Sequence, residues 1–161
     1  MSNASREKLV AEIGQLVMRW QDATQEFDDA VGKEHDLNAA DRRCLALISE
    51  GARAASEIAA ETALTAASVT SLIDRLEARN LVRRRPDPGD RRRVLVEATE
   101  KAQKLIARHY LPIARAGAQL LGKYSLAELE AVRRFVSDAL ALQRRTTAEQ
   151  FGEIRAGPRA G

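Results

Sequence analysis

The chain has 161 residues and a formal net charge of +3, with 30% charged and only 4% aromatic residues. This length predicts one domain with a sizeable core, filled by alanine and aliphatic side chains because aromatic residues are scarce. The longest apolar runs are too short to cross a bilayer and no leader precedes the first helix, so we expect a cytoplasmic protein without membrane contact. The single cysteine, Cys44, excludes an intramolecular disulfide and fits a reducing compartment.

The first predicted element is a long amphipathic helix within residues 5–35. Its apolar side chains recur at steps of three, four or seven residues, at Leu9, Ile13, Leu16, Trp20, Phe27 and Val31. A helix this long has more apolar surface than a small domain usually covers, which indicates a partner subunit. A second helix follows, with Asn38 as N-cap and Asp41 in its first turn, and it stops at Gly51. Cys44 lies on its apolar face, which predicts an inert, buried thiol and not an oxidation sensor.

A helix–turn–helix is predicted next. A short helix spans Ala55 to Thr62, and Thr65 caps a second helix that ends at Asn80, a residue that tolerates the left-handed backbone. The apolar stripe of the second helix consists of Val69, Leu72, Ile73 and Leu76. Its opposite face carries small and polar residues, namely Ala67, Ser68, Thr70, Ser71, Asp74 and Arg75. Such a face can enter a DNA major groove about 12 Å wide without steric conflict.

A basic β-hairpin over residues 81–97 follows the helix–turn–helix. Apolar, β-branched residues at both ends favour strands, and two prolines and a glycine interrupt its centre. Six arginines and two aspartates lie between Arg83 and Arg93, so this segment has a charge of +4 and the rest of the chain, by difference from +3, has −1. Burying unpaired charge is costly, so the hairpin should lie at the surface and meet an anion. Arginines on such a wing can reach the minor groove of DNA.

Two more helices complete the predicted order. Thr99 caps a helix that runs to about Gly122 with a kink at Pro112, and Ser125 and Glu128 form a capping box for the last helix. The expected inward face of the last helix consists of Leu126, Leu129, Val132, Val136 and Leu140. Residues 146–161, which end in a stretch rich in glycine, alanine, arginine and proline, are expected to form a frayed tail. The fold class is therefore mostly α (α+β), with a winged helix–turn–helix.

Three segments resemble the MarR (multiple antibiotic resistance regulator) family: Ala55-Ser-Glu-Ile-Ala-Ala60, Val69-Thr-Ser-Leu-Ile-Asp-Arg-Leu-Glu77 and Asp87-Pro-Gly-Asp-Arg-Arg92. The resemblance extends from the first long helix to the last. It implies one domain over 5–161, with dimerisation helices at 5–35 and 99–145 and a winged helix–turn–helix DNA-binding lobe at 36–98. It also implies a homodimer on a pseudo-palindromic operator in double-stranded DNA. Transcriptional control, most often repression relieved by a small-molecule effector or an oxidant, is the implied function.

The resemblance also assigns roles to residues of this chain. The DNA-binding part of the recognition helix consists of Thr65, Ala67, Ser68, Thr70 and Ser71. Of these, Ser68, Thr70 and Ser71 are expected to touch bases or phosphates. Arg75 matches a position that contacts phosphate or braces the wing. Arg92 matches the arginine that enters the minor groove, and Asp90 matches the aspartate that holds it. Arg91 and Arg93 alternate with Arg92 along the strand, so they should point to phosphates or solvent.

The chain departs from the family pattern at three places. Ala63 stands where the turn usually has glycine, so a left-handed backbone there would cost about 1 kcal/mol. Asn80 replaces another frequent glycine, which is a physically mild change. Ala98 and Ala102 weaken the usual Leu-Thr-x-x-Gly entry to the fifth helix. None of these differences removes a residue that is expected to contact DNA.

Other interpretations stay open. The chain could be an architectural, non-specific DNA-binding protein without an effector, or a winged helix that binds a protein partner. Trp20 could line an effector pocket, although a core position is the commoner role of tryptophan. His35 and His109 share no ligand spacing with Cys44 or a carboxylate pair, so no metal and no other cofactor are expected. The sequence has no phosphate-binding loop, nucleophile elbow or plausible triad, so an enzyme is not expected.

Overall fold

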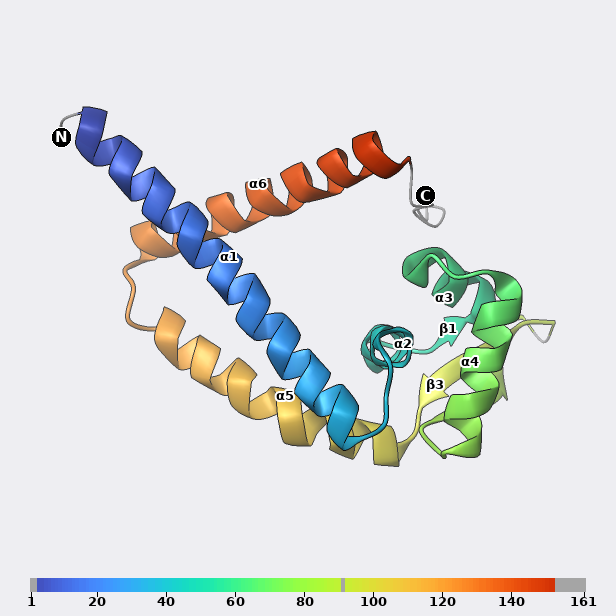
Figure 1. The fold of residues 1–161 in the computed structure, drawn as a ribbon. Helices are drawn as coiled ribbons and strands as arrows, with labels where there is room; N and C mark the ends of the chain where they lie inside the picture. The colour runs from blue at the N-terminus through green and yellow to red at the C-terminus, as the bar shows by residue number, and fades with distance from the viewer. Residues whose placement is uncertain (1–2, 91, 153–161) are drawn as a thin grey trace. The chain divides into compact units, whose positions relative to one another are not determined.

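The computed structural model describes residues 3–90 and 92–152, and the chain divides into two compact units after Arg42. Its helices are α1 (Asn3–Glu34), α2 (Ala39–Ser49), α3 (Ala55–Thr62), α4 (Ala66–Ala78), α5 (Glu100–Leu121) and α6 (Leu126–Phe151) (Figure 1). Its strands are β1 (Arg53–Ala54), β2 (Val82–Pro86) and β3 (Val94–Ala98). The predicted fold class, mostly α with a small antiparallel sheet, is confirmed. Within the described residues, no helix combines the length and apolar character needed to cross a membrane.

The turn that follows α1 is closed by one arginine. Arg42 donates to the Leu37 carbonyl at 3.2 Å and to the Asp29 carboxylate at 2.7 Å. The Leu37 N–H in turn donates to the Gly32 carbonyl at 2.7 Å. A Cβ atom on Gly32 would lie 2.1 Å from Nη1 of Arg42 and 2.6 Å from the Leu37 oxygen, so this close approach requires glycine.

The predicted cap of α2 is present and reciprocal. The Asp41 N–H donates to Oδ1 of Asn38 at 2.9 Å, and the Asn38 N–H donates to Oδ2 of Asp41 at 3.1 Å. These bonds satisfy two of the backbone donors that a helix start leaves without an intrahelical partner. Cys44 is fully buried, as its place on the apolar face of this helix predicts.

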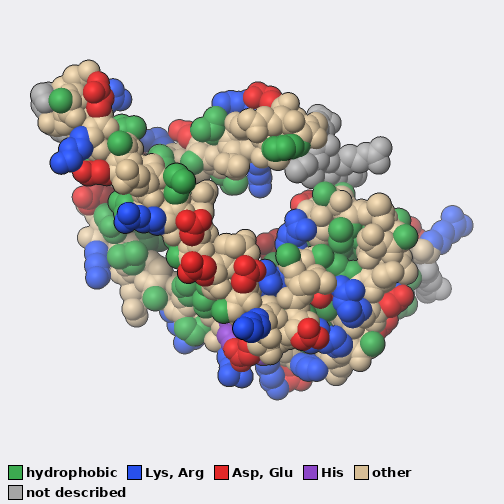
Figure 2. Space-filling model, viewed as in Figure 1, with side chains coloured by type: hydrophobic (Ala, Val, Ile, Leu, Met, Phe, Trp, Pro, Cys, Tyr) green, Lys and Arg blue, Asp and Glu red, His purple; other side chains and the backbone are tan. Residues whose placement is uncertain are grey.

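The apolar faces of α1 and α6 are largely exposed in the single protomer. On α1, the exposed fractions of Leu9, Ile13, Leu16 and Trp20 lie between 40% and 67%, although Val31 near its end is buried. On α6, the predicted inward residues Leu126, Val132, Val136 and Leu140 are exposed, and none of its residues is buried. The expected inward face of α6 is therefore not buried in the single protomer, and what covers it stays a prediction. Figure 2 shows hydrophobic side chains on the visible face of α6.

The core of the second unit lies between α2, α3, α4 and the sheet. The predicted stripe of α4, Val69, Leu72, Ile73 and Leu76, is buried throughout, and α4 contacts α3 and β2. Ile58 of α3, Val82 of β2 and Val96 of β3 are also buried. Burying each such aliphatic side chain contributes about 1.5–3 kcal/mol. We call this assembly of α3, α4 and the sheet, residues 53–98, the winged lobe, and the β2–β3 hairpin, residues 82–98, the wing.

Two non-glycine residues with left-handed backbone form the turns of the winged lobe. Ala63, at the end of α3, has φ 56° and ψ 28°, so the backbone is left-handed there without the glycine that the family pattern usually has. The expected strain is about 1 kcal/mol. Asn80, after α4, has φ 55°, a conformation that asparagine tolerates better than alanine does. Thr65 caps α4 as predicted, accepting from the Ser68 N–H at 3.2 Å.

The sheet contains one strand more than the sequence predicted. β1 pairs antiparallel with β3 through Arg53 and Ala54 only, which gives the strand order β1-β3-β2. Two residues are too few to produce a period-two pattern, so no sequence signal marked this strand. β3 also begins only at Val94, so the predicted strand alternation of Arg91, Arg92 and Arg93 was wrong. Arg91 lies outside the described residues.

The last two helices begin as predicted, and the second ends later. Thr99 caps α5, which continues through Pro112 as a single helix. Ser125 forms the capping box of α6 with Glu128. The hydrogen bonds from Ser125 lower the pKa of the Glu128 carboxyl. α6 extends to Phe151, past the predicted tail boundary at residue 146. The helix persists because residues 141–151 contain neither proline nor glycine. Residues 153–161 lie outside the described residues.

One carboxylate joins the two strands of the wing. Arg83 and Arg85 lie on the same face of β2, and Glu97 is the register partner of Arg83 on β3. Nε of Arg83 lies 2.5 Å from Oε1 of Glu97, and Nε of Arg85 lies 2.6 Å from Oε2. The hydrogen bond from Arg85, followed by that from Arg83, lowers the pKa of Glu97 below its ordinary value.

We expect Glu97→Gln to destabilise the fold by about 1 kcal/mol at neutral pH, the upper range for exposed ion pairs. A carboxyl whose pKa is lowered in the folded state contributes stability above its unfolded-state pKa and loses that contribution as the pH falls through the folded-state value. Denaturant titrations at neutral and acidic pH should therefore show a difference between variant and wild type that disappears in acid. Glu130→Gln, at an exposed carboxylate of α6, is the control. An equal loss at both pH values would contradict this role for Glu97.

Candidate nucleic-acid interface

The outward face of α4 carries the side chains that the sequence assigned to it. The predicted residues Thr65, Ala67, Ser68, Thr70, Ser71 and Arg75 are all exposed: Thr65 is the N-cap of α4, and the others lie on the helix away from the buried stripe. Because an α-helix has 3.6 residues per turn, burial of the apolar stripe of α4 determines which residues of the helix face the solvent. Apart from Asp74 and Arg75, the side chains on this face are short. The helix therefore offers a narrow convex surface with hydroxyl groups, of a size that fits a DNA major groove.

The hydroxyl groups on this face differ in the hydrogen bonds that they already make within the helix. The Thr65 and Ser68 hydroxyls lie 2.9 Å apart, and both belong to the cap of the helix. The Thr70 hydroxyl donates its proton to the Ala66 carbonyl at 3.0 Å, which leaves its oxygen lone pairs available to accept. Thr70 is thus arranged as an acceptor from a donor group, such as a base amino group, and less as a donor to phosphate.

The arginines of the wing are mostly paired with carboxylates of the same lobe. Arg83 and Arg85 share Glu97, as described above. Nη2 of Arg93 lies 3.2 Å from Oε1 of Glu57 on α3, and its Nη1 lies 3.8 Å from Oδ2 of Asp87. Basic and acidic side chains are accordingly interspersed over the lobe in Figure 2. The hairpin is therefore less of an open cationic surface than its +4 charge suggests.

Arg84 points the other way and joins the wing to α4. Its Nη2 lies 2.5 Å from Oδ1 of Asp74, its Nη1 donates to Oε2 of Glu77, and its backbone N–H donates to Oε1 of Glu77 at 3.1 Å. The hydrogen bond with Asp74 is the main reason that the pKa of Arg84 is raised, with Glu77 adding to it. The sequence analysis missed this contact. The available signal was the alternation of β2, which separates Arg84 from Arg83 and Arg85.

The turn of the wing presents Arg92 to the outside. Oδ1 of Asp90 accepts from the Arg92 N–H at 2.9 Å, and the Arg93 N–H donates to the Asp90 carbonyl at 2.9 Å. Asp90, predicted to hold Arg92, thus binds the backbone N–H of this arginine. Among the described residues, the guanidinium of Arg92 has no ion-pair partner, and the residue is exposed. Arg92 is therefore available to an external anion.

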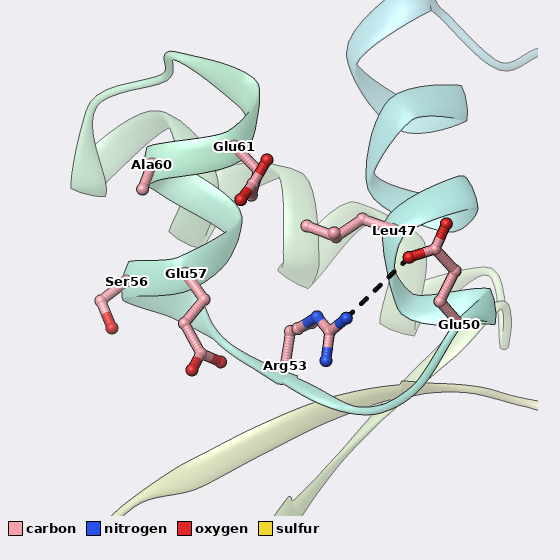
Figure 3. Close-up of a pocket in the computed structure, with 7 residues that line it drawn as sticks. All are labelled: Leu47, Glu50, Arg53, Ser56, Glu57, Ala60 and Glu61. Atoms are coloured by element: carbon pink, nitrogen blue, oxygen red, sulfur yellow. Dashed lines mark ion pairs between the residues drawn. The ribbon is translucent and has the colours of Figure 1, made fainter. Parts of the chain in front are cut away.

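A pocket of about 420 Å³ lies between α2, β1 and α3. Figure 3 shows its seven lining residues, which are Leu47, Glu50, Arg53, Ser56, Glu57, Ala60 and Glu61. Arg53 faces Glu50 at 4.0 Å across one side of it. Trp20, the predicted effector contact, is not among the lining residues; it lies on α1 with 67% of its surface exposed.

The sequence is similar to a known family model and to known regulators. The model of the MarR family matches residues 35–93. The uncharacterized HTH-type transcriptional regulator YcgE of Bacillus subtilis is 32% identical over 136 residues, which cover 84% of this chain and 88% of YcgE. The HTH-type transcriptional repressor NicR of Pseudomonas putida is 38% identical over 88 residues, which cover 54% of this chain and 55% of NicR.

Solved structures share the fold. A point mutant of MepR from S. aureus, bound to an oligodeoxyribonucleotide, has a TM-score of 0.55 and 19% identity, covering 82% of this chain and 97% of MepR. NadR in complex with 4-hydroxyphenylacetate has a TM-score of 0.57 and 17% identity, covering 78% of this chain and 89% of NadR. The family model spans the helix–turn–helix and the turn of the wing, and YcgE matches along most of both chains. The chain therefore belongs to the MarR family of winged helix–turn–helix transcriptional regulators.

Proposed function

We propose that this regulator is a homodimer that binds a pseudo-palindromic operator in duplex DNA and represses transcription by blocking polymerase. The observation that carries the proposal is the presence of two exposed features in one lobe: the small polar face of α4, and Arg92 at the turn of the wing, which has no ion-pair partner among the described residues. The first has the size for a major groove and the second has the charge for an adjacent minor groove. Thr65, Ala67, Ser68, Thr70 and Ser71 would lie in the major groove, with Arg75, Asp90, Arg91 and Arg93 supporting the two limbs.

The exposed apolar faces of α1 and α6 support the homodimer. Large aliphatic side chains recur there at helical spacing, and monomeric proteins seldom leave apolar surface of this extent in contact with water. A second copy of the chain offers the same faces, so an isologous contact can bury both sets together. Two-fold symmetry would then place two α4 helices on successive major-groove faces, about 34 Å apart.

A small-molecule effector that changes this spacing would release the repressor from both half-sites together. NadR, which shares the fold, was solved with 4-hydroxyphenylacetate, which supports a ligand-responsive mechanism here as a proposal. Trp20 is the proposed effector contact on α1. It is the only tryptophan of the chain, so its fluorescence would report ligand contact directly. The proposed site of action is the cytoplasm.

Selection of bound sequences from random duplex DNA tests the proposed function. A regulator should enrich an inverted repeat with half-sites about one helical turn apart, and it should prefer that sequence over random DNA by about 10³-fold or more at physiological salt. Fluorescence anisotropy with the selected duplex and a scrambled duplex gives the ratio. A ratio near one would favour an architectural DNA-binding protein, and failure to bind any duplex at low salt would favour a protein-binding winged helix.

Arg92→Ala should weaken operator binding by about 1–3 kcal/mol and leave the dimer intact, because the side chain has no partner within the described residues to lose. Gel-shift titration and light scattering measure the two properties. Lys123→Ala removes the same charge from the loop before α6 and serves as the control. Unchanged affinity of the Arg92 variant would refute its assignment to the DNA contact.

Val136→Asp should convert the dimer to monomer, because it places a charge in the middle of the exposed apolar face of α6. Ser137→Asp adds the same charge one position away, on another face of the helix, and should leave the dimer unchanged. Sedimentation equilibrium of both variants measures the difference. The dimer proposal fails if wild type sediments as a monomer at micromolar concentration, or if both variants dimerise as well as wild type does.

A further inference from the structure

The ion pairs between β2 and α4 assign a distinct task to one arginine of the wing. We propose that Arg84 is a positioning residue, which fixes the wing to α4 so that Arg92 reaches the minor groove, and that Arg84 does not itself bind phosphate. This inference rests on the proposed function and adds to it a division of labour between arginines that are close together in sequence.

Arg84 is bound to α4 from three directions. Nη2 and Nη1 engage Asp74 and Glu77, and the backbone N–H reaches Glu77 as well. Asp74 and Glu77 are three residues apart and therefore lie on the same side of the helix, where their like charges would repel each other without the guanidinium. A planar guanidinium has its donors in a fixed fork, so binding two carboxylates defines the orientation of β2 relative to α4.

The same contacts make Arg84 a poor phosphate ligand. One guanidinium charge faces two carboxylates, so this cluster has a formal charge of −1 and repels the DNA backbone. Its side chain is one-third exposed, at 33%, whereas Arg83 on the other face of β2 is 69% exposed. A phosphate would have to displace a carboxylate that already lies within 2.5 Å. Arg92 has no such competitor among the described residues.

Arg84 lies near the position along the wing where the third strand, β1, ends and only β2 and β3 continue. In the strand register, Arg53, Val96 and Arg84 form one row across β1, β3 and β2. One row further, β1 ends at Ala54, so the Pro86–Val94 pair and the turn beyond it belong to two strands only. Isolated two-stranded ribbons are marginally stable. The turn begins after Pro86, about three residues or roughly 10 Å beyond Arg84 along an extended strand, so a small tilt at Arg84 becomes a larger displacement of Arg92.

A double-mutant cycle on operator binding tests the proposal. Wild type, Arg84→Gln, Arg92→Ala and the double variant are titrated with the selected duplex. If Arg84 acts through Arg92, each single change weakens binding by about 5-fold to 100-fold, and the double variant binds within about 2-fold of Arg92→Ala. In the Arg92→Ala background, Arg84→Gln should also leave the salt dependence unchanged. Losses that multiply, or a slope of log K against log salt that falls by about 0.9, would instead mean a direct phosphate contact.

The carboxylate partners provide a test with the opposite electrostatic sign. Asp74→Ala with Glu77→Ala removes two negative charges from α4, so charge alone predicts tighter binding to DNA. The proposal predicts weaker binding, with no further loss when Arg84→Gln is added. Glu61→Ala removes a carboxylate from α3 that does not contact the wing, and it is the control. Tighter binding of the double-alanine variant would overturn the positioning role.

Thermal unfolding separates positioning from loss of fold. Arg84→Lys keeps the charge and one carboxylate contact, and it should recover part of the affinity lost in Arg84→Gln. An Arg84 variant that unfolds, or that loses affinity equally with and without Arg92, would overturn the proposal. A wild-type chain without preference for any duplex would refute the proposed function as well, whereas specific wild-type binding with multiplicative losses would refute only the role of Arg84.

Discussion

Burial of one aliphatic stripe on α4 is the constraint from which the rest of the winged lobe follows. With Val69, Leu72, Ile73 and Leu76 packed inward, the opposite residues have to face outward, and no other rotation of the helix buries a comparable set. The hairpin must then pack its apolar ends against the same core, which places β2 beside α4. The proximity of a basic strand and an acidic edge of the helix is a result of this packing, and the ion pairs complete it.

The charge of the wing is organised by strand alternation. Successive arginines of β2 point to opposite faces, so one set meets Glu97 across the hairpin and the other meets Asp74 and Glu77 on α4. Each pair is exposed enough to contribute modestly to the free energy of unfolding. Their larger effect is geometric, because they define where a two-stranded ribbon lies relative to a helix. Only at the turn, where Asp90 is occupied with the backbone, does a guanidinium face outward without a partner among the described residues.

Much of this architecture could be predicted from the sequence, because helical periods and caps are local signals. The bounds of α3 and the caps at Thr65, Thr99 and Ser125 all follow from residues close together in the chain. Non-local pairings could not be predicted. The two-residue β1 has no periodicity, and the partners of the arginines depend on which turn of α4 lies against β2. What covers the exposed face of α6 could not be predicted for a related reason: an apolar stripe indicates burial but does not indicate which chain provides it.

The pairing of the wing arginines has a kinetic consequence for how this protein would approach DNA. At physiological ionic strength, charges further apart than about 8 Å are largely screened, and a neutralised pair has only a weak field beyond its own dimensions. Beyond that distance, the electrostatic potential of the lobe is that of a few net charges, because most of the six arginines between Arg83 and Arg93 are paired with carboxylates. Electrostatic steering would then add little to the rate of encounter. Discrimination between sequences would depend mainly on how long the lobe stays once its polar helix face and Arg92 are both seated.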